Sequence, residues 1–60
     1  MQHSIGKTIK ELRKNRGLTQ EELAGKIYVT RTAVSKWESG GGYPETEKLL
    51  LLSKELDISL

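Results

Sequence analysis

Apolar residues recur at helical spacing in four stretches of the chain. In the first, Ile5, Ile9 and Leu12 follow one another at intervals of four and three residues, which places them on one face of a helix. This pattern predicts a helix over Ser4–Arg16, with its first residue as the N-cap. Gly17 then stands where a left-handed residue is expected to end the helix.

The second stretch carries a complete helix-start signal. Thr19 and Glu22 have the spacing of a capping box, and Leu18 and Leu23 have the spacing of a hydrophobic staple. We therefore expect a helix over Thr19–Ile27. Its apolar face holds Leu23, Ala24 and Ile27.

The third stretch repeats this entry eleven residues later, with Thr30 as the cap and Val29 and Val34 as the staple. It predicts a helix over Thr30–Ser39, so that only Tyr28 and Val29 separate it from the second helix. Two helices joined so closely must turn sharply, which is typical of a helix-turn-helix.

The fourth stretch follows the glycines at 40–42 and Pro44, which disfavours helix before it. A helix is expected over Thr46–Leu56, with the acidic Glu45 at its positive end. Its expected core stripe consists of Leu49, Leu52 and Leu56, which should pack on Val34 and Trp37. The sequence therefore predicts an all-α fold, a small bundle of four helices with a central helix-turn-helix, in a single domain over residues 1–60.

Length and composition limit the other possibilities. A chain of 60 residues buries only about 60% of the surface that its unfolded form exposes, so its stability is small. It has no Cys to form disulfides or thiolate metal sites. The longest apolar run, at residues 49–52, is far shorter than the roughly 20 residues of a membrane span. We therefore expect no membrane partner and a cytoplasmic location.

Charge is unevenly distributed along the chain. Residues 1–16 carry five basic side chains and one acidic side chain, whereas residues 37–60 carry two basic and five acidic ones. A basic front of this kind favours a polyanionic partner, although uneven surfaces also arise without one.

The third helix has one face without any carboxylate. At about 100° per residue, its outer face is wholly polar and its inner face is apolar. The outer face holds Arg31, Thr32, Ser35, Lys36 and Ser39, and the inner face holds Ala33, Val34 and Trp37. An ordinary amphipathic surface helix would look similar, but Glu is common elsewhere in this chain. A face whose side chains can all donate hydrogen bonds, and which carries no carboxylate, fits phosphates and base-edge acceptors.

The stretch LRKNRGLTQEELAGKIYVTRTAVSKWESG resembles the phage-repressor (Cro/cI or XRE) family of bacterial helix-turn-helix regulators. The resemblance extends from Ile5 to Leu60 and rests on TQEELA, the VTR turn, AVSKWE and the Gly and Pro that follow. It implies a fold like that of lambda repressor and binding to double-stranded DNA.

The resemblance also assigns roles to individual residues. It implies that Gln20 and Thr30, at the starts of the second and third helices, contact phosphates. The positions that it assigns to bases are Arg31, Thr32 and Lys36, with Ser35 on the same face. Arg13 and Glu38 match a pair that often forms an internal ion pair in this family, and we expect that pair to be partly buried.

Three departures from the family pattern affect these expectations. Tyr28 occupies a turn position that is often Gly, so a positive φ there would be costly. Thr46 is polar and Leu51 apolar, which reverses the polarity that the family usually has at these positions of the fourth helix. The family's usual fifth helix would follow Leu60. We expect an apolar patch at Leu50 and Leu51 to pair with a second copy; the competing interpretation is that Leu51 packs against further residues of a longer protein and that this chain is monomeric.

Catalysis finds no support in the residue types. His3 is the single His and has no second His, Cys or paired acid beside it. The glycines at 40–42 lack the Lys-Ser/Thr sequel of a phosphate loop, and Glu21 and Glu22 fit first-turn helix acids better than metal ligands. We expect no enzyme activity, no cofactor and no metal.

These observations favour a sequence-specific DNA-binding regulator, which we expect to be a repressor that binds a roughly palindromic operator as a homodimer. The alternative is an antitoxin-like or protein-interaction module that works through the leucine-rich fourth helix. Salt-sensitive binding to random duplex would distinguish the two, since only the first requires it.

Overall fold

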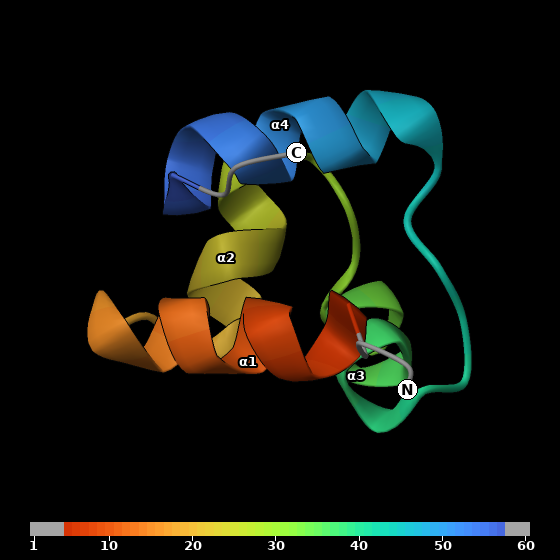
Figure 1. Ribbon diagram of the computed structural model, residues 1–60, viewed down its shortest axis with the longest axis horizontal. Helices are drawn as coiled ribbons and strands as arrows, with labels where there is room; N and C mark the ends of the chain where they lie inside the picture. The colour runs from red at the N-terminus through yellow and green to blue at the C-terminus, as the bar shows by residue number, and fades with distance from the viewer. Residues whose placement is uncertain (1–4, 58–60) are drawn as a thin grey trace.

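The computed structural model describes residues 5–57, and all regular secondary structure within that range is helical. The four helices are α1 (Ile5–Asn15), α2 (Gln20–Lys26), α3 (Arg31–Ser39) and α4 (Thr46–Leu56), as Figure 1 shows. The predicted all-α fold is therefore confirmed. The expected cap at Ser4 and the single His at position 3 lie outside the described residues.

The helix boundaries follow the capping signals closely. The side chain of Thr19 accepts a hydrogen bond from the Glu22 backbone N–H, and the Glu22 carboxylate accepts one from the Thr19 N–H, which confirms the capping box. Gly17 has a φ of 69° beyond α1. Because capping residues flank a helix, α1, α2 and α3 are each one or two residues shorter than expected.

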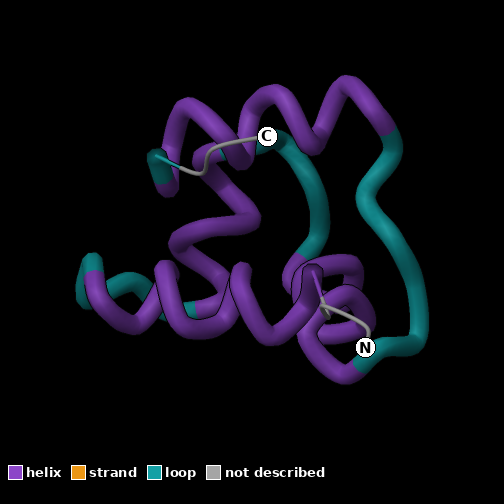
Figure 2. The backbone as a smooth tube through the Cα atoms, viewed as in Figure 1, coloured by secondary structure: helices purple, strands orange, loops and turns teal. Residues whose placement is uncertain are grey.

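The arrangement of the helices places α3 at one side of the molecule. In Figure 1, α1 and α4 cross the view at the bottom and the top, with α2 between them, and Figure 2 shows the long loop that joins α3 to α4. α3 contacts both α1 and α2, and α4 contacts α1. Short loops join the first three helices, and α3 packs against both of the helices that precede it in the chain.

The core combines apolar side chains from all four helices and from the turn after α2. Its buried members are Ile9, Leu23, Ala24, Ile27, Val34, Trp37, Leu52 and Leu56. This agrees with the expected inner face of α2, with Val34 and Trp37 of α3, and with two of the three expected leucines of α4. Ala33, the third residue of the expected inner face of α3, is half-buried and packs against this core.

The third leucine of the α4 stripe is a correction. Leu49 is only half-buried, and Leu51, which we expected to be exposed beside Leu50, packs against the core. Leu49 and Leu51 lie on opposite flanks of the Leu52–Leu56 stripe. The helical period does not encode which flank a neighbouring helix covers.

A close backbone contact fixes the crossing of α1 and α3. Gly6 is buried, and a Cβ atom at this position would overlap the carbonyl oxygen of Trp37. Only glycine permits this approach, so Gly6 sets how closely α3 lies against α1. The pattern of apolar residues gave no indication of this role.

Candidate nucleic-acid interface

Four side chains on the outer side of α3 form a surface that we call the reading face: Arg31, Thr32, Ser35 and Lys36. All four residues are exposed, as the sequence predicts for the outer side of an amphipathic helix. The reading face carries two positive charges and two hydroxyl groups and no carboxylate. It therefore offers hydrogen-bond donors to an anionic partner without charge repulsion.

Thr30 holds the N-terminus of α3 beside the reading face. Its side-chain oxygen accepts a 3.1 Å hydrogen bond from the Ala33 backbone N–H. The hydroxyl proton is not used in this bond, and Thr30 is exposed. Thr30 is thus a helix cap whose hydroxyl can also donate to an external acceptor.

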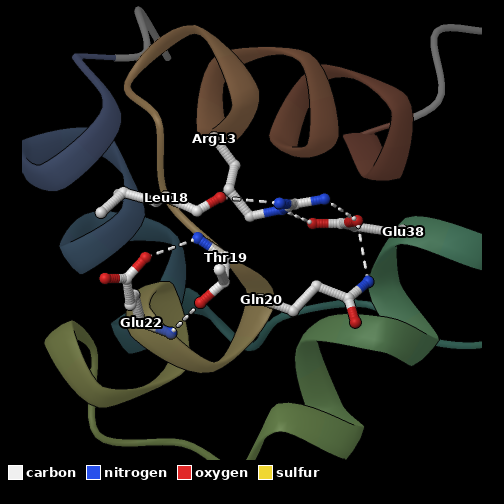
Figure 3. A network of polar contacts seen from close by, with 6 residues as sticks. All are labelled: Arg13, Leu18, Thr19, Gln20, Glu22 and Glu38. Carbon is white, nitrogen blue, oxygen red and sulfur yellow. Dashed lines mark hydrogen bonds and ion pairs between the residues drawn. The ribbon is translucent and has the colours of Figure 1, made fainter.

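The only acidic residue of α3 points away from the reading face, toward α1. Glu38 and Arg13 form a two-pronged ion pair, with 2.7 Å between Nε and Oε2 and 3.1 Å between Nη2 and Oε1 (Figure 3). Their side chains retain only 4% and 10% of their exposure. The structure therefore contains the partly buried ion pair expected from the sequence.

Two further contacts complete the network around this ion pair. The Nη1 of Arg13 donates a 2.7 Å hydrogen bond to the Leu18 carbonyl, in the segment that joins α1 to α2. The side-chain amide of Gln20 donates a 3.0 Å hydrogen bond to Oε1 of Glu38. The network thus ties α1, the first residue of α2 and the C-terminal turn of α3 together (Figure 3).

The surroundings of Glu38 keep it ionised. Burial raises the pKa of its carboxyl group, but the hydrogen bonds from Arg13 and Gln20 and the positive charges of Arg13 and Lys10 outweigh burial and hold the pKa below its ordinary value. Glu38 therefore remains a carboxylate at neutral pH, and its charge is neutralised within the protein instead of being presented to a ligand.

Gln20 has a structural contact that sequence reasoning missed. We expected its side chain to reach a phosphate, and the structure shows it half-buried with its amide directed to Glu38. One amide N–H is used in this bond and the other remains available as a donor. The one available signal was that Gln20 begins α2 close to the expected position of the ion pair.

Exposed basic residues lie on α1 and in the turn that follows it. Lys10 and Lys14 of α1 and Arg16 of the turn are exposed, and Lys10 is close enough to Glu38 to lower its pKa. Such exposed cations attract polyanions over a distance of about a Debye length, ~8 Å at physiological salt. In the described part of the chain, no group of His, Cys, Asp and Glu side chains is arranged to hold a metal ion, and no helix is long and apolar enough to cross a membrane.

The turn between α2 and α3 contains the predicted strained residue. Tyr28 has a φ of 61°, and its neighbour Val29 donates a 3.0 Å backbone hydrogen bond to the Ala24 carbonyl. Val29 packs against the core, whereas Tyr28 is 79% exposed. The sharp turn therefore directs a large aromatic side chain into solvent beside the N-terminus of α3.

Comparison with known proteins agrees with this geometry. A family model described as helix-turn-helix matches residues 9–60. The HTH-type transcriptional activator BcrR of Enterococcus faecalis is 50% identical over 52 residues, which make up 87% of this chain and 26% of that relative. The P22 c2 repressor in complex with a synthetic operator superimposes with a TM-score of 0.91 at 34% identity, covering 97% of this chain and 88% of the repressor.

A second solved structure, the restriction-modification controller protein C.AhdI from Aeromonas hydrophila, has a TM-score of 0.84 at 34% identity, with 93% of this chain and 85% of that chain covered. The chain is thus a helix-turn-helix domain. It belongs to the phage-repressor (Cro/cI, XRE) type of the helix-turn-helix family. It spans 26% and 48% of the lengths of the first two curated relatives that it matches.

Proposed function

We propose that this domain binds double-stranded DNA sequence-specifically and regulates transcription. The observation that carries the proposal is the exposed, carboxylate-free reading face on α3, the second helix of a helix-turn-helix. In this geometry α3 enters the major groove with its N-terminal residues at base edges, while α2 crosses the backbone. The solved relative that contains an operator, the P22 c2 repressor, supports the same partner class.

The reading face supplies the donors that base edges require. Arg31 and Lys36 can each donate to the O6 and N7 acceptors of guanine, the commonest specific contact in the major groove. Thr32 and Ser35 carry hydroxyl groups that donate or accept, so each suits several bases. We propose that these four residues determine the sequence preference.

Phosphate contacts would hold the domain in register without contributing sequence preference. We propose that Gln20 donates its second amide N–H to a phosphate, and that Thr30 donates its hydroxyl proton to another. Both side chains are anchored by a hydrogen bond within the protein, Gln20 to Glu38 and Thr30 to the Ala33 N–H. Anchored donors lose little conformational freedom on binding, which favours their use.

A homodimer is the proposed functional unit, because one domain of this size contacts only a half-site. A two-fold dimer would place two α3 helices about one DNA turn apart, ~34 Å, on a roughly palindromic operator. Leu50 is 56% exposed on α4, with the exposed Glu47 and Lys54 one turn away on either side. An antiparallel pairing of two α4 helices through Leu50 would bring Glu47 near Lys54 of the partner subunit, which makes the surface self-complementary.

We propose that the domain represses transcription. We also propose that it acts in the cytoplasm and catalyses no reaction. A domain that occupies an operator blocks other proteins from the same DNA, so repression needs no further surface. The relative BcrR bears the name of an activator. A reporter gene placed behind the selected operator decides the sign: lower expression in the presence of the protein supports repression, and higher expression contradicts it.

An interaction module that works through α4 is the competing function. A module that binds a protein partner through α4 would not need the outer side of α3 to be free of carboxylates. Selection of bound duplexes from a random pool tests DNA binding directly. We expect an enriched, two-fold symmetric motif and binding that weakens steeply with salt. Recovery of unenriched duplexes, or no retention on heparin, would contradict the proposal.

A further inference from the structure

The exposed tyrosine in the turn between α2 and α3 is not part of the apolar core. Tyr28 is 79% exposed, and it adopts a left-handed backbone conformation with a φ of 61°. Non-glycine residues, and bulky ones in particular, are unfavourable in this conformation. A glycine at this position would relieve the strain, and no core contact would be lost with the ring.

The position of Tyr28 relative to α3 suggests what the side chain does. The residue lies two positions before the cap Thr30 and three before Arg31, the first residue of the reading face. If the N-terminal turn of α3 reaches base edges, the chain just before it must leave the groove past the sugar-phosphate backbone. The major groove is only about 12 Å wide, so a long side chain at this point faces its rim.

The chemistry of the side chain fits that location. A phenol hydroxyl is neutral and donates to phosphate oxygens, and tyrosine is among the residues that make such contacts in protein–DNA complexes. Val29 is held by packing and by its bond to the Ala24 carbonyl, so the backbone that carries Tyr28 has a defined direction. The ring is thus presented from a fixed support.

We infer that Tyr28 is an additional DNA-backbone contact, in which its hydroxyl donates to a phosphate at the rim of the groove that α3 enters. The inference rests on the proposed function of DNA binding. It assigns a binding role to a residue whose local conformation opposes its presence. The contact is independent of sequence, because a phosphate carries no base information.

Two variants separate this role from a structural one. Tyr28→Phe keeps the ring and the backbone strain and removes only the hydroxyl, whereas Tyr28→Gly removes the side chain and relieves the strain. We expect both variants to bind the selected operator and a random duplex about two- to tenfold more weakly than the wild type, the range for loss of one hydrogen bond. We expect the salt dependence to keep its slope, because a neutral hydroxyl displaces no counterion.

Thermal unfolding provides the second readout. Tyr28→Gly should unfold at the same or a higher temperature than the wild type although it binds more weakly. Asp57→Gly is the matched control, because Asp57 is the other non-glycine residue with positive φ in the described chain. It should also retain or gain stability, without any loss of affinity.

The measurement is duplex affinity at several salt concentrations for the wild type and the three variants, with Arg31→Ala as a reference for base reading. Operator affinity of Tyr28→Phe equal to that of the wild type would overturn the inference, as would a loss confined to one sequence. If the wild type bound no duplex, or if Arg31→Ala left the preferred sequence unchanged, the proposed function itself would fail. A normal response of Arg31→Ala with full affinity in both Tyr28 variants would refute only the inference.

Discussion

The α2–α3 pair and α4 are specified in different ways. In the α2–α3 pair, polar groups at fixed spacing determine the geometry: Thr19 and Thr30 cap the two helices, and Glu38 is bound by Arg13 and Gln20. α4 begins at Thr46, its N-cap residue Glu45 makes no side-chain capping hydrogen bond, and the helix carries four consecutive leucines. Hydrogen bonds define a direction, whereas apolar packing does not. The orientation of α3 is therefore determined by directional polar contacts to α1 and α2, whereas that of α4 depends on apolar packing against its neighbours.

The largest test of this comparison removes the polar link to α3. Glu38→Ala leaves the Arg13 guanidinium with little solvent and no carboxylate partner. Breaking one partner of such a buried pair costs about 3–5 kcal/mol. We expect the free energy of unfolding in urea to fall by about that amount.

A double-mutant cycle with Arg13→Ala provides the control, because it separates the pairwise interaction from other effects of each substitution. Additive effects of the two substitutions would mean that the side chains act as independent solvated charges. The pH dependence gives the same information without a truncation. Because the folded-state pKa of Glu38 is lowered, its contribution is present above the pKa of the unfolded state and is lost as the pH falls through the folded-state pKa. Glu38→Gln should therefore lose less stability on acidification than the wild type.

The second test forces α1 and α3 apart. Gly6→Ala introduces a methyl group where the Trp37 carbonyl oxygen lies. Overpacking of this kind costs typically about 1–3 kcal/mol, although alanine favours helix more than glycine does. We expect a net loss of unfolding free energy, measured in urea. Gly25→Ala in α2 is the matched control, because a methyl group at Gly25 meets no other atom and should stabilise the protein. Equal effects at both glycines would contradict the close contact.

The third test compares the two caps. Thr19→Ala and Thr30→Ala each remove a side-chain bond to a helix N-terminus, at a cost of about 0.5–2 kcal/mol. Thr19→Ala should cost more, because the capping box that it forms with Glu22 loses its geometry. Thermal unfolding of both variants measures the difference. A larger loss of thermal stability for Thr30→Ala would contradict the claim that the capping box of α2 stabilises its helix more than the single cap of α3 does.

The smallest effects are expected on the outer side of α4. Leu51→Ala uncovers part of the core, so we expect it to reduce the unfolding free energy, whereas Leu50→Ala should change it by no more than about 0.5 kcal/mol. Sedimentation of Leu50→Lys against the wild type then tests the proposed dimer surface. We expect the wild type to associate at higher concentration and Leu50→Lys to remain monomeric. An unchanged dimer in the variant would exclude Leu50 from the seam.

The sequence predicted those features that depend on local hydrogen bonding or on a strong period. The capping box at Thr19, the cap at Thr30 and the boundaries of α4 belong to this group. The ion pair between Arg13 and Glu38 joins residues 25 positions apart, and it was expected from the resemblance to the family. The expectations for Leu49 and Leu51 were wrong: Leu49 is only half-buried, and Leu51 packs against the core instead of being exposed. Neighbouring helices decide which side of a leucine run is covered.

Two contacts could not be predicted from the helical period of the sequence. The backbone contact at Gly6 depends on the crossing of α1 and α3, and the bond from Gln20 to Glu38 depends on how α2 lies against α3. Both arise from the placement of whole helices. The roles of Arg31, Thr32, Ser35 and Lys36 remain predictions, since exposure alone does not show what they contact.

The most direct test of the central claim is duplex selection from a random pool with the wild type and Arg31→Ala in parallel. Because Arg31 lies at the start of the reading face, its loss should relax the preference at one base pair of each half-site. The preferred base at that position should lose about 1–3 kcal/mol of discrimination, while the rest of the motif is kept. An identical motif for both proteins would contradict the assignment of α3 as the helix that reads DNA.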